Sequence, residues 1–371
     1  MPPATSVNCK LVVDALAARS GGTAYAAVQV ARALAQHHPC EVLAVTRRGS
    51  LVAVGLTPRG RLRLHTLRRG RRLELLRRVL WEALALPGMT RDATALVSWS
   101  GMLPRRIQAP LVCYLANPVM FEQHRLEHRI RRWAVRRTAH EAAHVLVPTA
   151  AMAATVEPVV ARTPHVVPLG VDHERFSPAA APGSELLCVA DQYAHKRHDV
   201  VLAAWRELPA PRPTLRLVGA AVVDRAANRR IVETVGSLRT YGTIVVESDL
   251  SLGELVDAYR RARVFVLASE HESFSMPLLE AQACGVPCVV RDLPALRETG
   301  GDGTAYVQGD DPRTWATAIE SLLQDEPRHG RARETAVAHA AQYSWERTAA
   351  AIAELAASHL QAPPQVPQRC G

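Results

Sequence analysis

Two acidic residues flank the start of a short apolar segment in the sequence ASEHESFSMPLLEAQACGVPCV (268–289). Glu272 precedes the segment and Glu280 lies within it, with seven residues between them. Pro277 suits the first turn of a helix, where its missing N–H would have no partner in any case. Gly285 is typical of the residue that follows a helix. The pattern predicts a short helix with one carboxylate before it and another on its body.

The chemistry of these carboxylates depends on what precedes the helix. RVFVLAS (263–269) is an apolar segment typical of a buried strand. A helix that begins at the carboxyl end of a parallel strand offers free N–H groups and about half a positive charge. Ligands of open α/β sheets bind there, and a nucleoside diphosphate fits the charge. Glu272 and Glu280 would then accept hydrogen bonds from sugar hydroxyls and would not contact phosphates.

The rest of the chain alternates between apolar segments typical of strands and segments with helical periodicity. The first apolar segment, residues 9–18, precedes the glycine-containing sequence SGGTAY (20–25). Further strands are predicted at residues 41–46, 94–100, 110–117, 144–149, 165–172, 185–191, 214–220, 243–248 and 287–292. Helices are predicted at residues 28–38, 75–86, 125–142, 199–208, 224–240 and 253–262. This alternation predicts the α/β class, with two doubly wound parallel sheets, and FSPAAAPGS (176–184) reads as the linker between them.

The composition of the whole chain sets broader limits. A length of 371 residues favours two domains. No apolar segment reaches about 18 residues, so no transmembrane helix is expected, and the start lacks the pattern of a secretory signal. The seven cysteines are odd in number and form no C-x-x-C pair. We therefore expect free thiols and a cytoplasmic protein, with no disulfide framework or zinc site.

The formal net charge of +10 is unevenly distributed. Residues 1–168 contain 24 Lys and Arg against 9 Asp and Glu, whereas residues 169–371 contain 21 against 26. Residues 58–78 and 125–137 are the most basic stretches. They could contact an acidic acceptor or the anionic inner face of a membrane, or they could be a solvated surface enriched in arginine. Nucleic acid is not expected as a partner, because aromatic residues are few and are not interleaved with the arginines.

The segment ESFSMPLLEAQACGVPCV (272–289) resembles the E-x7-E segment of the retaining GT-B glycosyltransferases of the group 1, or family 4-like, type. The resemblance extends along the chain. LLCVADQYAHKRHDVVLAAW (186–205) is similar to the first strand and loop of the family's nucleotide domain. HVVPLGVDHERFSP (165–178) is similar to its interdomain segment, and YSWERTAAAIAEL (343–355) to its C-terminal helix.

The family resemblance implies a GT-B fold, in which two Rossmann-like domains face an interdomain cleft. The N-terminal, acceptor-binding domain would be residues 1–172, joined by a C-terminal helix (344–360) that crosses back to it. The C-terminal, nucleotide-sugar-binding domain would be residues 173–343. Residues 361–371 would be a disordered tail.

The resemblance also implies roles for particular residues. Lys196 would neutralise the leaving diphosphate, Glu272 would lie near the hydroxyls of the transferred sugar, and Glu280 would bind the ribose hydroxyls. A lysine at this position is notable because the chain has only two, Lys10 and Lys196. The other positions implied to bind the donor are Gly21, Gly22, Arg197, Leu250, Phe274, Ser275 and Met276.

Three positions depart from the family pattern. Ala190-Asp191 stands where many relatives carry an arginine that faces the phosphates, and Arg197 is the candidate to replace it. Ala116-Asn117-Pro118 stands where relatives carry a histidine near the donor sugar, so that Asn117 is the candidate there. Ser273 and Ser275 replace two glycines, a change that requires the backbone geometry to be kept.

The function implied by the resemblance is retaining transfer of a hexose from a UDP- or GDP-type sugar to an acceptor hydroxyl. No cofactor and no metal are expected, because no D-x-D motif is present and Lys196, the helix dipole and backbone N–H groups supply the positive charge. A pseudoglycosyl coupling enzyme or a sugar phosphorylase is the alternative on the same fold. A basic module that binds nucleic acid or a membrane surface is the alternative of another class.

Overall fold

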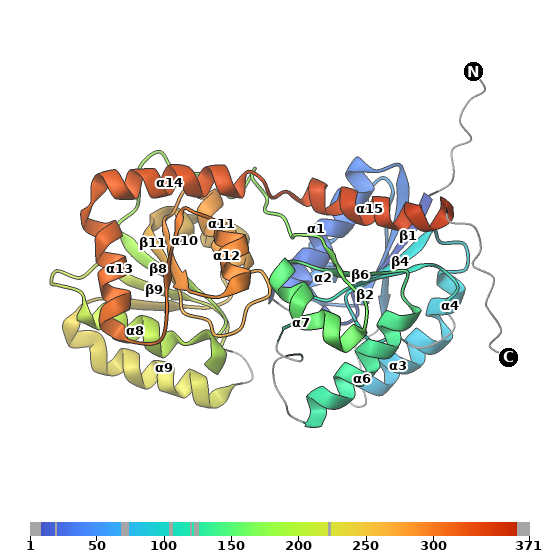
Figure 1. The fold of residues 1–371 in the computed structure, drawn as a ribbon, viewed down its shortest axis with the longest axis horizontal. Coiled ribbons are helices and arrows are strands. Elements are labelled where there is room, and N and C mark those ends of the chain that lie inside the picture. Colours follow the sequence, from blue (N-terminus) through green and yellow to red (C-terminus); the bar gives the residue numbers. More distant parts are fainter. Residues whose placement is uncertain are drawn as a thin grey trace, which may run out of the picture. The chain divides into compact units, whose positions relative to one another are not determined.

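The computed structural model describes residues 9–18, 21–67, 74–103, 107–118, 121, 126–221 and 224–361. Internal contacts divide the chain into two units (Figure 1). The first unit comprises residues 1–169 and 345–371, and the second comprises residues 170–344. Each unit is built on one sheet whose strand pairs are all parallel. The predicted α/β class with two doubly wound parallel sheets is confirmed.

The sheet of the first unit has seven strands in the order β3-β2-β1-β4-β5-β6-β7. The strands are β1 (Cys9–Asp14), β2 (Cys40–Arg47), β3 (Leu62–Leu67), β4 (Ala95–Ser98), β5 (Leu111–Tyr114), β6 (His144–Val147) and β7 (His165–Val166). The helices are α1 (Gly21–His37), α2 (Leu51–Gly55), α3 (Glu74–Leu84), α4 (Leu86–Met89), α6 (Leu126–Glu141), α7 (Ala150–Val160) and α15 (Trp345–Gln361). The strand order reverses between the neighbours β1 and β4, which makes this pair the topological switch point of the first sheet.

The central strands of this sheet are covered on both faces, as a parallel sheet requires. Every residue of β4 and of β5 is buried. The C-terminal helix α15 returns to the first unit and packs against α1, where the rings of Tyr25 and Trp345 meet edge to face with their centroids 6.0 Å apart. The resemblance had implied this return of the last helix, and the structure confirms it.

The sheet of the second unit has six strands in the order β10-β9-β8-β11-β12-β13. The strands are β8 (Glu185–Val189), β9 (Leu215–Val218), β10 (Ile244–Glu247), β11 (Ala262–Leu267), β12 (Cys288–Arg291) and β13 (Thr304–Val307). The helices are η1 (Ala194–Lys196), α8 (His198–Glu207), α9 (Arg225–Leu238), η2 (Arg239–Tyr241), α10 (Leu252–Arg261), α11 (Met276–Ala283), α12 (Pro294–Gly300), α13 (Pro312–Gln324) and α14 (Glu326–Ala340). Its switch point lies between β8 and β11.

One expectation about the cysteines is wrong. Cys9 and Cys40 form a disulfide, although the sequence favoured free thiols throughout. The two residues lie 31 positions apart, and only the parallel register of β1 and β2 makes them direct neighbours. Four other cysteines of the described chain are buried free thiols: Cys113, Cys188, Cys284 and Cys288. Strand β3 was also not predicted, because its segment belongs to the arginine-rich stretch 58–78.

Candidate functional site

The carboxyl ends of β8 and β11 meet at the switch point of the second sheet, and the loops that follow them carry two predicted site residues. Lys196 ends η1 in the loop after β8, and Glu272 lies in the loop after β11. Their side chains form an ion pair, with Nζ and Oε1 2.7 Å apart. Only 20% of the lysine side chain and 11% of the glutamate side chain are exposed, so the pair is only weakly screened by solvent. The N–H of Glu270 also donates to the carbonyl of His195, which joins the loops a second time.

Glu280 lies about one turn into α11, the helix that follows the Glu272 loop. It is buried, and the hydroxyl of Tyr259 on α10 donates to its Oε2 over 2.8 Å. Burial raises the pKa of this carboxyl from 4.5 to about 7, and the hydrogen bond from Tyr259 opposes part of that rise. The side chain therefore changes its charge near neutral pH, which is uncommon for a glutamate and typical of functional sites.

Ser275 immediately precedes α11 and has an unusual backbone conformation. Its φ of 76° and ψ of 83° lie in the left-handed region, which favours glycine. Its Oγ is buried and has no hydrogen-bond partner among the described residues. The position requires a glycine-like turn, as the family pattern implies, although a serine occupies it. The left-handed backbone and the buried hydroxyl without a partner both cost free energy, and such costs are concentrated at functional sites.

The other expected donor contacts of the second unit lie along the same carboxyl edge of its sheet. Phe274 is buried, and its ring meets that of Tyr343 edge to face with centroids 5.8 Å apart. Half-buried Met276 begins α11, and half-buried Leu250 follows the edge strand β10, two strands away from β8. The packing of Phe274 holds in place the backbone that leads into α11.

Arg197, which is expected to contact the donor phosphates, forms ion pairs with three carboxylates of the protein. Its guanidinium pairs with Asp199 on α8, with Glu270 after β11 and with Asp310 after β13, at 2.9, 2.5 and 2.8 Å. These partners, Asp199 first, raise its pKa further above its usual value. Asp310 also pairs with Arg291 at 2.6 Å. The geometry makes Arg197 a link between three loops, and its expected phosphate contact has no support in these interactions.

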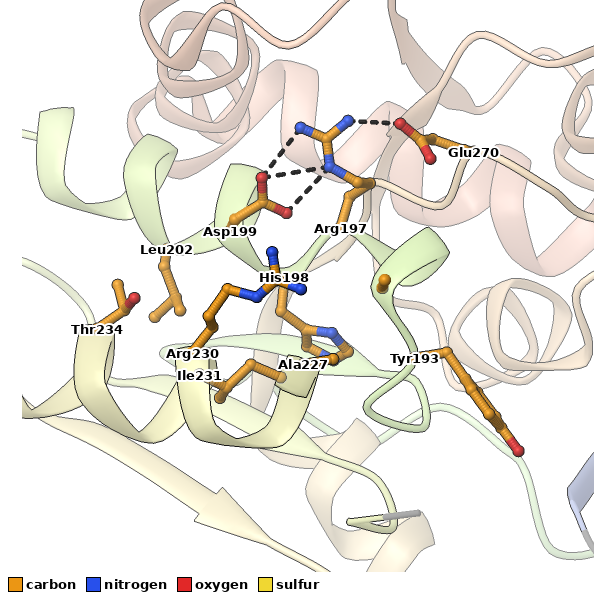
Figure 2. Close-up of a pocket in the computed structure, with 11 residues that line it drawn as sticks. Tyr193, Arg197, His198, Asp199, Leu202, Ala227, Arg230, Ile231, Thr234 and Glu270 are labelled. Carbon is orange, nitrogen blue, oxygen red and sulfur yellow. Dashed lines mark hydrogen bonds and ion pairs between the residues drawn. The ribbon is translucent and has the colours of Figure 1, made fainter. Parts of the chain in front are cut away.

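A pocket of about 340 Å³ lies beside Arg197, between α8 and α9 (Figure 2). His198, Leu202, Arg230 and Ile231 are among the residues that line it, and Figure 2 shows the guanidinium of Arg197 turned toward Asp199 and Glu270. Lys196, Glu272 and Glu280 do not line it. The pocket is therefore distinct from the group of residues at the switch point.

The remaining predicted residues belong to the first unit. Gly21, with a φ of 61°, and Gly22 are exposed at the start of α1, and Asn117 is exposed after β5. Their approach to a donor bound by the second unit stays a prediction, and the residues that the structure brings together are those of the second unit.

Sequence reasoning missed a buried acidic group at the switch point of the first sheet. Asp14 ends β1 and accepts a hydrogen bond of 2.7 Å from Ser98 at the end of β4. Glu82 on α3 is equally buried, and burial, followed by the charge of Asp14, raises its pKa from 4.5 to about 8. Asp14 could have been identified from the sequence, because an aspartate at the end of an apolar strand is a candidate site residue. No feature of the sequence around Glu82 indicated that it would be buried.

Comparison with known proteins matches part of the chain to a family. Residues 172–339, nearly the whole of the second unit, fit the model of the family described as glycosyl transferases group 1. This segment belongs to that family. Lys196, Glu272 and Glu280 all lie within the group 1 segment.

The similar proteins of known name include D-inositol 3-phosphate glycosyltransferases. The protein of Thermobispora bispora is 35% identical over 169 residues, which are 43% of this chain and 40% of the relative. The protein of Geodermatophilus obscurus is 33% identical over 227 residues, which are 54% of this chain and 50% of the relative. The chain thus spans about half the length, or less, of these curated relatives.

Solved structures resemble the chain over almost its whole length. The Anabaena HepE structure in complex with UDP-glucose has a TM-score of 0.77 at 14% identity and covers 94% of this chain and 99% of its own. The sucrose-phosphate synthase of Thermosynechococcus elongatus has a TM-score of 0.80 at 17% identity and covers 96% and 100%. Together with the group 1 segment, these likenesses confirm the GT-B fold.

The strain at Ser275 leads to a prediction about stability. Ser275→Gly should raise the free energy of unfolding by about 1 kcal/mol, because relief of a left-handed cost of about 1–2 kcal/mol exceeds the added flexibility of glycine. Ser275→Ala should stabilise less, because it removes only the unpartnered hydroxyl and keeps the Cβ. Chemical denaturation of both variants measures the difference.

The matched control for these variants is Ser237→Ala, which changes an exposed serine on α9. Its effect should stay within about 0.5 kcal/mol of zero, as is usual for surface positions. A Ser275→Gly variant no more stable than Ser275→Ala would contradict the assignment of strain to this residue.

Proposed function

We propose that the protein transfers a sugar from a nucleoside diphosphate sugar to a hydroxyl of an acceptor, with retention of the anomeric configuration and without a metal ion. The observation that carries the proposal is the switch point of the second sheet. There the ion pair of Lys196 and Glu272 joins the loops after two neighbouring strands, and α11, which carries Glu280, follows the Glu272 loop. The membership of residues 172–339 in the group 1 glycosyl transferases supports the same reaction class.

The donor is proposed to bind along the carboxyl edge of the second sheet. The free N–H groups and positive end of α11 suit a diphosphate, and the ammonium of Lys196 adds a full positive charge. Glu280 is proposed to grip the vicinal hydroxyls of the ribose. A UDP-type donor is the first to test, because the similar HepE structure holds UDP-glucose.

The acceptor is proposed to carry negative charge. The first 168 residues have an excess of 15 basic over acidic residues, which favours an anionic partner. Relatives of the group 1 segment are named D-inositol 3-phosphate glycosyltransferases, so that a phosphorylated polyol is the first acceptor to test. The same basic charge would attract other anionic acceptors, and these form the rest of the screen.

The proposed mechanism uses positioning and charge. The leaving diphosphate gains negative charge as the bond to the sugar breaks, and Lys196 and the start of α11 stabilise it. Before the donor binds, Glu272 holds the ammonium of Lys196 in place at 2.7 Å. The acceptor hydroxyl attacks on the face from which the diphosphate leaves, and a phosphate oxygen takes its proton. Such a step needs no separate protein base, and it relies on the orientation of the two substrates.

The titration of Glu280 predicts a pH dependence of donor binding. Its pKa of about 7 means that the carboxyl is mostly neutral at pH 6 and mostly ionised at pH 8. An ionised carboxylate accepts hydrogen bonds from both ribose hydroxyls, each worth about 1.5–3 kcal/mol. The affinity for UDP measured by calorimetry should therefore rise between pH 6 and pH 8.

Variants of Glu280 separate this titration from that of the phosphates. Glu280→Gln keeps an oxygen that can accept a hydrogen bond from Tyr259, but the amide does not titrate. The pH dependence of its affinity for UDP should therefore reflect only the titration of the phosphates. Glu280→Ala should weaken binding at pH 8 by about tenfold or more. Wild-type and Glu280→Gln curves of the same shape would remove Glu280 from the ribose site.

The second lysine of the chain provides a matched control for Lys196. Lys196→Ala should lower the rate of transfer by about 10²–10³, as removal of a preorganised charge does. Lys10→Ala also breaks an ion pair of 2.7 Å, with Asp92 in the first unit, and should leave the rate unchanged.

Turnover measured in EDTA should equal turnover without it, because Lys196 and the start of α11 supply the positive charge in the proposed mechanism. Activity that disappears in EDTA and returns with magnesium would contradict the role given to Lys196.

The stereochemistry of the product tests the proposed mechanism as a whole. Attack on the face of the departing diphosphate predicts an α-linked product from an α-linked donor. The coupling constant of the anomeric proton, measured by NMR on the isolated product of a gluco-configured donor, should be small. A large diaxial coupling would show a β-linkage and would overturn the mechanism.

A further inference from the structure

Helices α3 and α6 of the first unit carry an exposed apolar surface that the proposed reaction does not use. On α3, Val79, Leu80 and Leu84 are 44%, 49% and 79% exposed. On α6, Ile130 and Trp133 are 63% and 65% exposed. These are five of the ten large apolar side chains that are exposed in the described part of the chain. Such side chains are normally scattered singly, so this concentration calls for a partner.

The two helices are neighbours on one face of the first sheet. Trp81 of α3 packs against the same hydrophobic cluster that contains Val135 and Ala139 of α6. The loop after β4 is bound from both sides: Arg78 of α3 donates to the Oγ of Ser100, and Arg137 of α6 donates to the carbonyl of Leu103. Figure 1 shows both helices on the same side of the first unit. We therefore treat the exposed residues of the two helices as one surface.

The charge of α6 is mostly positive, and its two acidic residues, Glu127 and Glu141, lie near its ends. Residues 129–140 contain five arginines and no acidic residue. Arg129, Arg131 and Arg136 are exposed beside Ile130 and Trp133. Arg137 lies over the indole of Trp133, with its guanidinium carbon 5.9 Å from the ring centroid. Apolar and aromatic side chains surrounded by arginines are typical of helices that lie in the interface of an anionic bilayer.

We propose that the surface formed by Val79, Leu80, Leu84, Ile130 and Trp133 with the arginines of α6 docks the protein on an anionic lipid bilayer. The arginines would contact the headgroups, and the apolar side chains would enter the boundary between headgroups and acyl chains. The apolar residues decide against nucleic acid, because a phosphate backbone offers nothing to Leu84 or Ile130. No helix in the described ranges is long and apolar enough to cross a membrane, and the proposal requires only contact in the plane of the interface.

The test is sedimentation of the full-length protein with vesicles of phosphatidylcholine alone or mixed with phosphatidylglycerol. Binding should require phosphatidylglycerol and weaken as salt is added. The double variant Ile130→Ser, Trp133→Ser should bind the mixed vesicles at least about tenfold less tightly than the wild type. The triple variant Arg129→Gln, Arg131→Gln, Arg136→Gln should also lose binding, and any binding that persists should no longer depend on salt.

The matched control is the double variant Val232→Ser, Val246→Ser, which changes two apolar residues of the second unit that are 67% and 42% exposed. It should bind vesicles like the wild type. Thermal melts and UDP titration of all variants show whether the fold and the nucleotide site are intact, so that failure here is distinguishable from failure of the proposed transfer reaction. Failure of the wild type to bind the mixed vesicles would overturn the proposal. So would an Ile130/Trp133 variant that binds normally, or binding to duplex RNA that the same variant retains in full.

Discussion

The ion pair between Lys196 and Glu272 depends on the topology of the second sheet. The two residues are 76 positions apart, and they meet only because β8 and β11 are direct neighbours whose following loops leave from the same edge. A parallel sheet places the carboxyl ends of all its strands at that edge, and the reversal of strand order leaves room for a ligand between two loops. The same edge receives the start of α11 and the carboxylate of Glu280. The strand order therefore determines where the site lies, and the side chains determine its chemistry.

The sequence predicted this part of the molecule well because its signals are local. Apolar, β-branched runs such as 263–269 favour buried strands, and Pro277 and Gly285 mark the ends of a helix without reference to distant residues. The position of that helix determines where Glu272 and Glu280 lie. The features that could not be predicted require knowledge of which strands pair. The Cys9–Cys40 disulfide needs the register of β1 and β2, and the interaction of Asp14 with Glu82 needs α3 to lie near the end of β1.

Arg197 shows how the same limit applies within the site. From the sequence, an arginine beside the diphosphate lysine is a natural phosphate ligand, because its charge and its position in the chain are all that can be seen. The structure adds the carboxylates of Glu270 and Asp310, which come from loops 73 and 113 residues away. Three carboxylates around one guanidinium satisfy its charge locally. The same pairs connect the loop that holds Lys196 to the loop that holds Glu272, so Arg197 also fixes the position of these loops, and its contact with the donor stays a prediction.

Burial gives the site its sensitivity to pH. Glu280 and the Lys196–Glu272 pair are shielded from solvent, but their contacts differ. Glu272 has a cation at 2.7 Å that compensates the loss of hydration, whereas the contact seen at Glu280 is one neutral hydroxyl from Tyr259, and its pKa rises accordingly. Hydroxyl groups of a bound ribose would supply the hydrogen bonds that burial removes, and the ionised form would then be favoured. The two glutamates of one short segment thus differ in their surroundings, because Glu272 pairs with a cation and Glu280 accepts a hydrogen bond from a neutral hydroxyl.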